Sequence, residues 1–165
     1  MFNTALKKII GGLVLVLIVA LIIYIYFSRP IFTRDIFPNN PPYPAIATIN
    51  RQTIDIIKIA KTPLEQTRGL SNHPPLAENE GMLFEFPDKQ IRRFWMKEML
   101  FPLDIIWIND SRIINISKNL PPEGSTPTKI YSSITPADAV LEINAGISDK
   151  YGFKTGDQVS IGLPL

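Results

Sequence analysis

The chain has 165 residues, which suits one modest domain with an appendage, and it contains no cysteine. Disulfide frameworks and thiolate chemistry are therefore excluded. The formal net charge of +2 is unevenly distributed, because residues 1–42 hold four basic side chains against one acidic one and the remainder holds thirteen against fourteen. The residues after position 42, with a net charge of −1, lack the basic surface that nucleic-acid-binding domains carry, so no nucleic-acid partner is expected.

The first element is a run of 19 residues, Ile9–Phe27, without charge or proline. As a helix it would reach roughly 28 Å, close to the thickness of the hydrocarbon core of a bilayer. A secretory signal peptide is the alternative, but its apolar region is normally shorter and ends in a small-x-small cleavage site. Tyr24 and Tyr26 instead resemble an interfacial aromatic belt. The pattern favours an uncleaved transmembrane anchor within residues 1–28, with membrane lipid as its partner.

Charges on either side of this run bear on its orientation. Lys7 and Lys8 precede it, whereas Arg29 and Arg34 follow it. Together with the N-terminal amine, the first pair favours a cytoplasmic N-terminus. We therefore expect a single-pass protein of the cell membrane whose body lies outside the cytoplasm.

Residues 29–44 are rich in proline and predict a stiff, extended linker. The linker would hold the body away from the membrane. Because it also contains Ile36, Phe37 and Tyr43, part of it could instead pack on the domain. Both interpretations stay open at this point.

The body, residues 45–165, begins with two β-branched runs, Ala45–Asn50 and Thr53–Ala60, which predict a hairpin. A short helix follows, since Thr62 and Glu65 form a capping-box pattern and Gly69 is a plausible stop.

Apolar and β-branched runs predict most of the remaining elements of the body. A turn is expected at Pro87–Asp88, and a helical turn at Ser148–Tyr151. Further strands are expected at 81–86, 92–96, 103–108, 112–116, 139–144 and 158–161. The strands at 103–108 and 112–116 are predicted to form a second hairpin around Asn109-Asp110-Ser111. The predicted fold is mainly β (α+β), a small antiparallel β-barrel-like or sandwich domain with one or two short helices.

Several short motifs share one order with a known family. They are Arg68-Gly69-Leu70, Gly81-Met82-Leu83-Phe84, Phe94-Trp95-Met96-Lys97, Pro102-Leu103-Asp104, Val140-Leu141-Glu142 with Gly146, and Gly156-Asp157. Over about residues 45–161 the chain resembles the uncharacterised family numbered 192 among the domains of unknown function. The resemblance implies a compact β-rich domain, often exported or membrane-tethered in prokaryotes, and it implies no established activity.

Arg68, Lys97, Asp104 and Glu142 are charged residues of these motifs, embedded in or beside apolar residues. One hypothesis is a pocket in which Arg68 and Lys97 hold an anionic group while a carboxylate acts as acid or base. The other, which the sequence favours, is a buried ion network in which Asp104 pairs with one of the cations.

Trp95 and Trp107 could stack on a flat ligand, but as strand residues they are expected in the core. No metal or cofactor is expected, because one histidine without cysteine cannot build a zinc site and no glycine-rich phosphate loop is present.

Three functions remain open. The favoured one is a binding or accessory module of unknown molecular activity, with a protein partner or a small ligand. The alternative is a hydrolase or lyase that uses Asp104 or Glu142 with Arg68 and Lys97. A structural or assembly role is the third, and a contiguous exposed apolar patch would support it.

Overall fold

The computed structural model describes residues 43–164. The predicted anchor at 1–28 and nearly all of the predicted linker lie outside these residues. Among the residues described, no helix is long and apolar enough to span a bilayer. At the end of the linker, the Tyr43 hydroxyl donates a hydrogen bond to Glu80 Oε1 at 2.9 Å, so this residue contacts the domain.

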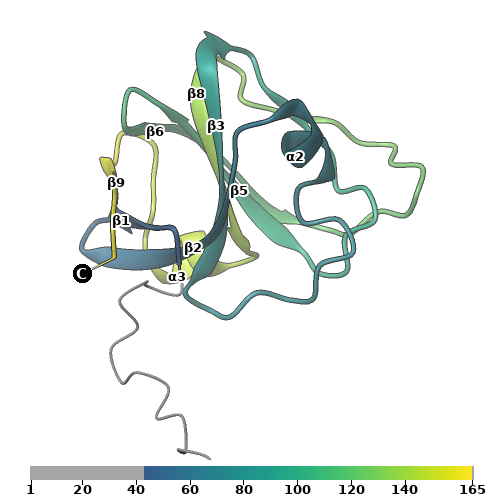
Figure 1. Cartoon of the computed structure of the whole chain (residues 1–165), viewed down its shortest axis with the longest axis horizontal. Helices are drawn as coiled ribbons and strands as arrows, with labels where there is room; N and C mark the ends of the chain where they lie inside the picture. Colours follow the sequence, from purple (N-terminus) through teal and green to yellow (C-terminus); the bar gives the residue numbers. More distant parts are fainter. Residues whose placement is uncertain (1–42, 165) are drawn as a thin grey trace, which may run out of the picture. The chain divides into compact units, whose positions relative to one another are not determined.

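A seven-stranded sheet forms the framework, in the order β6-β5-β8-β3-β2-β1-β9 (Figure 1). Its strands are β1 (Ala45–Ile49), β2 (Gln52–Ala60), β3 (Glu80–Gln90), β5 (Leu103–Asn109), β6 (Arg112–Leu120), β8 (Ala137–Asn144) and β9 (Val159–Gly162). Within residues 43–164, two short helices, α2 (Pro63–Arg68) and α3 (Ile147–Lys150), lie between strands. Neighbouring strands are antiparallel except β2 and β3, whose connection carries α2.

The sheet curls into a half-barrel. At one end the start of β6 meets the segment that leads into β9, where Ile113 N donates to Asp157 O and Val159 N donates to Ser111 O, each at 2.9 Å. Gly156 N returns a bond to Ile113 O at 2.8 Å. The predicted mainly-β, barrel-like architecture of the body is thus confirmed.

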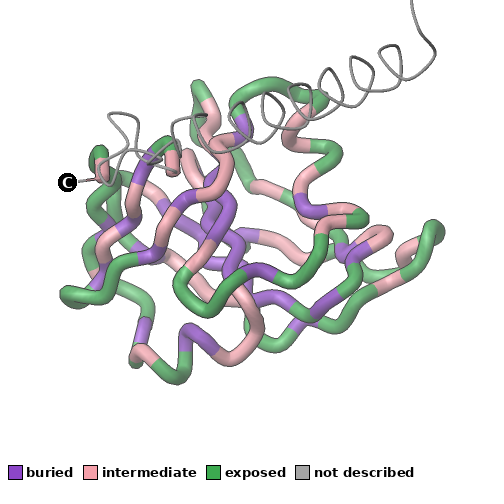
Figure 2. Tube along the Cα trace, turned by 60° about the horizontal axis from the view of Figure 1, so that its bottom comes forward, coloured by how far each residue is buried: buried purple, intermediate pink, exposed green. Residues whose placement is uncertain are grey.

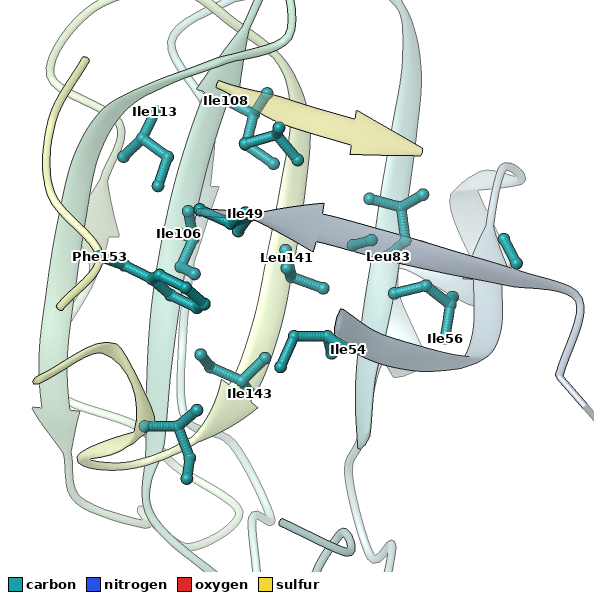
Figure 3. Packing of buried hydrophobic residues seen from close by; sticks show 14 residues of the cluster. Ile49, Ile54, Ile56, Leu83, Ile106, Ile108, Ile113, Leu141, Ile143 and Phe153 are labelled. Carbon is teal, nitrogen blue, oxygen red and sulfur yellow. The ribbon is translucent and has the colours of Figure 1, made fainter. Parts of the chain in front are cut away.

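Two hydrophobic clusters stabilise the domain, one on each face of the sheet. The first fills the curl and includes Ile49, Ile106, Leu141 and Phe153, which point toward one another between the strands (Figure 3). The second lies on the face that α2 covers, on the opposite side of β3 and β5 from β1 and β9 (Figure 1). In Figure 2 buried residues gather along the central strands, and the outlying loops are mostly exposed.

Both predicted hairpins are present. The β1–β2 turn holds Asn50 and Arg51 at φ of 50° and 68°, and the β5–β6 turn holds Asp110 and Ser111 at 48° and 58°. Positive φ at both central residues characterises the tight turns whose twist matches that of the strands. The helix α2 also begins as expected, because Thr62 and Glu65 form both bonds of a capping box and Gly69 follows its last residue.

One prediction about the middle of the chain is wrong, and another is confirmed only in part. No turn forms at Pro87–Asp88, because β3 continues through these exposed residues and only its pairing with β8 is interrupted there. Between Glu85 and Gln90 the pairing register shifts, which accommodates a proline that cannot donate to the ladder. The strand expected at 92–96 shortens to β4 (Arg93–Phe94), which pairs with β7 (Tyr131–Ser132) in a separate two-stranded sheet.

Candidate functional site

Glu142 lies near the centre of the sheet, on β8 between Met82 of β3 and Ile105 of β5. Alternation along β8 places its side chain on the same face as Val140, which belongs to the cluster beneath α2. Only 5% of the residue is exposed, and within the described chain its Oε2 has no hydrogen-bond partner. Burial disfavours the charged form and raises the pKa of this carboxyl to about 8. Near neutral pH Glu142 is therefore mainly a neutral carboxylic acid.

A cleft of about 370 Å³ opens above Glu142. Its walls come from α2, the residues after α2, the outer half of β3 and the β4 segment. The lining residues are Pro63, Gln66, Thr67, Arg68, Gly69, Leu70, Ser71, Phe84, Phe86, Ile91, Arg92, Arg93, Phe94, Trp95, Met99 and Glu142. Nine of these residues are apolar or glycine, and seven are polar or charged. Apolar and aromatic walls that carry convergent polar groups are typical of sites for small organic molecules.

Gly69 brings the chain close to the floor of the cleft. It has φ of 48°, where L side chains are strained, and a Cβ there would lie 3.4 Å from Phe84 Cζ and 4.0 Å from Glu142 Oε2. The helix before it is fastened to the sheet by Gln66 Nε2, which donates to Glu85 O at 2.9 Å. The same glycine that ends α2 thus leaves room beside the carboxyl.

Arg92 builds one wall. Its guanidinium lies 3.9 Å from the centre of the Phe86 ring, and its Nε donates to Ala137 O at 3.0 Å. It also forms an ion pair with Asp88 at 2.6 Å. With these partners, Arg92 serves as a fixed structural part of the wall.

Arg68 and Arg93 differ from Arg92, since both are exposed at the cleft. Neither takes part in any ion pair found within residues 43–164. Their guanidinium groups therefore make the mouth of the cleft positive and are available to an anionic group.

The two tryptophans have different positions. Trp95 is 42% exposed and lines the cleft, so the prediction that it is a core residue is wrong and its ring is open to a ligand. Trp107 is fully buried, as expected of a core residue, and its Nε1 donates to Ser117 Oγ at 3.0 Å. Phe94, which precedes Trp95 in the chain, makes edge-to-face contacts with Phe84 at 4.9 Å and with Trp107 at 5.4 Å between ring centres. This aromatic contact anchors the cleft wall to the core.

A second cleft of about 290 Å³ adjoins the first and shares four lining residues with it. It is lined by Thr67, Arg68, Ser71, Asn72, Trp95, Lys97 and Glu98. Lys97 is half-buried, and its carbonyl accepts a hydrogen bond from Ser71 Oγ at 2.8 Å. Three of the four residues predicted as a charged cluster, Arg68, Lys97 and Glu142, therefore line two adjoining clefts.

Asp104 does not belong to this group, and the predicted ion pair with Arg68 or Lys97 is wrong. Its buried carboxylate is occupied by backbone donors: Oδ1 accepts from Asn119 N at 2.8 Å, and Oδ2 accepts from Gly146 N at 3.1 Å and Ser148 N at 3.0 Å. Among the described residues it lines neither cleft. The backbone donors satisfy the charge, so a cation is not needed.

Sequence reasoning missed other parts of the clefts, chiefly Gly69, Phe84, Phe94 and Arg93. The Arg-Gly-Leu motif contained Gly69, but it was interpreted only as a helix stop. The aromatics carried no distinguishing signal, because an aromatic residue that lines a cleft and one in the core look alike in sequence.

The protein is thus a curled β-domain whose larger cleft is lined partly by aromatic side chains and has the neutral carboxylic acid of Glu142 at its floor. The chain belongs to the family of the domain of unknown function 192, described as "Uncharacterized ACR", whose model matches residues 45–161. No curated protein matches the chain.

The solved structures that are similar to it include the following two. A protein of unknown function from Novosphingobium aromaticivorans DSM 12444 is 35% identical, with a TM-score of 0.62 over 71% of this chain and 83% of that one. A Sinorhizobium meliloti 1021 protein described as "a putative transcription regulator" is 30% identical, with a TM-score of 0.62 over 70% of this chain and 90% of that one. The match covers nine tenths of the second chain, so that relative is little larger than this domain.

Proposed function

We propose that this domain is a binding module that takes a small organic molecule into the larger cleft, with Glu142 as its polar contact. The observation that carries the proposal is the buried Oε2 of Glu142, which has no partner within the described residues although it lies at the floor of an accessible cleft. A neutral carboxylic acid can both donate and accept, so it can bind a ligand hydroxyl, amine or carbonyl.

A purely structural role explains Glu142 less well. A buried polar atom without a partner costs about 1–3 kcal/mol, and an apolar residue between Met82 and Ile105 would avoid that cost. Such unsatisfied groups in native folds call for a functional reason. A ligand that hydrogen-bonds to the carboxyl supplies one.

An enzyme is the second candidate, and the raised pKa of Glu142 favours it. A group with a pKa of about 8 can release and regain a proton near neutral pH, as a general acid or base must. A hydrolase or lyase would then use Glu142 with Arg68, which lines the same cleft. Asp104 takes no part in this scheme, because its oxygens are occupied by backbone N–H groups.

Nucleic-acid binding forms no part of the proposal. The description of the Sinorhizobium relative names a regulator of transcription. In this chain the residues after position 42 hold thirteen basic side chains against fourteen acidic ones. That balance gives no electrostatic footprint for a phosphate backbone.

The proposed location is the outer face of the cell membrane, with residues 1–28 as the anchor. Ile9–Phe27 supports this by its length and lack of charge.

Full-length protein should stay in carbonate-washed membranes and yield an N-terminal peptide that begins at Met1 or Phe2. Protease added to cells with a permeabilised outer envelope should digest the body. Soluble protein that starts near Ser28 would contradict the anchor.

The binding proposal is tested with the isolated domain, residues 41–165, and the neutral fluorophore N-phenyl-1-naphthylamine, an aromatic amine. We expect saturable fluorescence enhancement in wild type. Trp95→Ala, which removes a wall of the cleft, should weaken the affinity at least about fivefold, since stacking of a flat ring on one aromatic side chain is worth about 1–3 kcal/mol.

Ile161→Ala is the matched control, because Ile161 is 41% exposed but lies on β9, outside both clefts. It should bind the fluorophore as the wild type does. Equal weakening by both substitutions, or no saturable binding to the wild type, would refute the larger cleft as the site.

A further inference from the structure

We infer that the second cleft binds the acidic group of the same ligand, which makes the ligand an amphiphilic anion. Its flat or apolar body would occupy the larger cleft, and its carboxylate, phosphate or sulfonate would lie between Arg68 and Lys97. This inference rests on the proposed function, which it extends by naming the chemical class of the ligand.

The two clefts form one continuous site. They share Thr67, Arg68, Ser71 and Trp95, so a molecule stacked on the Trp95 ring can reach both. Arg68 lines both clefts: the first contains the aromatic side chains of Phe84 and Phe94, whereas the second contains only polar or charged residues besides Trp95. A ligand that fills both spaces must therefore have an apolar part and a polar part.

The second cleft has a positive charge balance. Its lining includes two cationic residues, Arg68 and Lys97, and one acidic residue, Glu98, and the first cleft adds Arg93. Neither Arg68 nor Lys97 has an ion-pair partner among residues 43–164. Cations on a concave surface can pair with an oxyanion, and arginine can do so with two parallel hydrogen bonds.

The backbone that carries Lys97 is held in place before any ligand arrives. Ser71 Oγ donates to Lys97 O, and Asn72 N donates to Glu98 O, both at 2.8 Å. Asn72 and Glu98 have φ of 57° and 54°, a conformation that is uncommon for residues other than glycine. Strained residues fixed by surrounding bonds cluster at ligand sites, where they make the site rigid.

Glu142 is compatible with an anion nearby. It is buried at the floor of the first cleft, and burial keeps its carboxyl neutral near pH 7. A neutral carboxyl can hydrogen-bond to the ligand body without repelling the acidic group. Ionisation at higher pH would add a negative charge and weaken binding.

The test compares two fluorophores that differ by one acidic group. 8-Anilino-1-naphthalenesulfonate is N-phenyl-1-naphthylamine with an added sulfonate. For wild-type domain 41–165 at pH 7, we expect the sulfonate to bind at least tenfold more tightly than the neutral compound. Lys97→Gln changes a residue that lines the second cleft alone. It should reduce the ratio of the affinities for the sulfonate and the neutral fluorophore at least about fivefold, and it should leave the affinity for the neutral fluorophore unchanged.

Lys154→Gln is the control, because Lys154 is exposed and lies outside both clefts. Equal affinities of the two fluorophores for wild type, or a ratio that Lys97→Gln leaves unchanged, would overturn the acidic subsite while the larger cleft stands. Failure of both fluorophores to bind would overturn both proposals. Unchanged binding of the neutral compound also shows that the variant is folded.

Competition identifies the source of the anion. If 1-naphthyl phosphate displaces the sulfonate fluorophore at a lower concentration than dodecyl phosphate does, the result supports the inference and identifies the ligand as a water-soluble aromatic acid. If dodecyl phosphate is the more potent competitor, the result supports the inference and identifies the ligand as a lipid-like acid. Inorganic phosphate, which lacks a body, should displace the fluorophore far less than either, and equal displacement by all three would contradict an amphiphilic ligand.

Discussion

Replacing Asp104 with alanine should lower the free energy of unfolding of domain 41–165 by about 3–5 kcal/mol. The carboxylate is fully buried and accepts backbone hydrogen bonds from Asn119, Gly146 and Ser148. Alanine leaves these donors without an acceptor. An unsatisfied N–H costs about 1–3 kcal/mol where it is buried, as at Ser148, and the loss of the two partly buried bonds to Asn119 and Gly146 adds to that cost. Urea denaturation at pH 7, followed by circular dichroism, measures the change.

Asp149→Ala serves as the control, because Asp149 lies on α3 close to Ser148 in sequence but forms an exposed ion pair with Lys118. That substitution should cost at most about 1 kcal/mol. If Asp104→Ala cost no more than Asp149→Ala, the three backbone bonds would not hold the end of β6 and the start of α3 in place.

The partners of Asp104 also decide how its loss can be compensated. Had Asp104 paired with Arg68 or Lys97, an apolar replacement of that cation would restore stability, because no charge would remain stranded. Its partners are backbone N–H groups instead, which no side-chain substitution removes. We therefore expect Asp104→Ala combined with Lys97→Met to be no more stable than Asp104→Ala alone.

Local signals explain why much of the fold was predictable. The capping box of Thr62 and Glu65 and the two hairpins depend on residues a few positions apart, which the sequence displays directly. The β4–β7 pair was missed because Phe94 and Tyr131 are far apart in the chain and pair over only two residues. The continuation of β3 through Pro87 was missed because a proline is normally a sign that a strand ends.

The candidate site was predictable in its composition but not in its geometry. A charge within an apolar motif indicates a buried or partnered group, and Asp104 and Glu142 carry that same signal. They differ in their surroundings. Asp104 accepts hydrogen bonds from backbone N–H groups at the start of α3, whereas Glu142 lies among side chains at the floor of the larger cleft. Only the tertiary fold brings Gly69 and Phe84 beside Glu142, so sequence spacing could not separate the two carboxyl groups.

Glu142 should make the stability of the domain fall as pH rises. Its pKa is raised from 4.5 to about 8 by burial, so between these values the folded state binds a proton that the unfolded state has released. The folded state is thus favoured most at low pH, and that advantage is lost as pH rises from 4.5, with the loss complete above about 8. A shift of this size corresponds to roughly 5 kcal/mol, an upper limit because water can enter the cleft when the carboxyl ionises.

Glu142→Gln isolates this effect, because glutamine has a similar shape and does not titrate. The stability of the variant relative to wild type, measured by urea denaturation at intervals between pH 5 and 9, should rise by several kcal/mol across the range. Glu78→Gln is the matched control. The Glu78 side chain is exposed and its pKa is lowered by Lys150, so it is ionised throughout the range and its variant should follow the wild-type pH dependence. A constant difference between Glu142→Gln and wild type from pH 5 to 9 would show that Glu142 titrates near its ordinary pKa. The carboxyl would then be hydrated, and the cleft would lose the neutral hydrogen-bonding group on which the binding proposal depends.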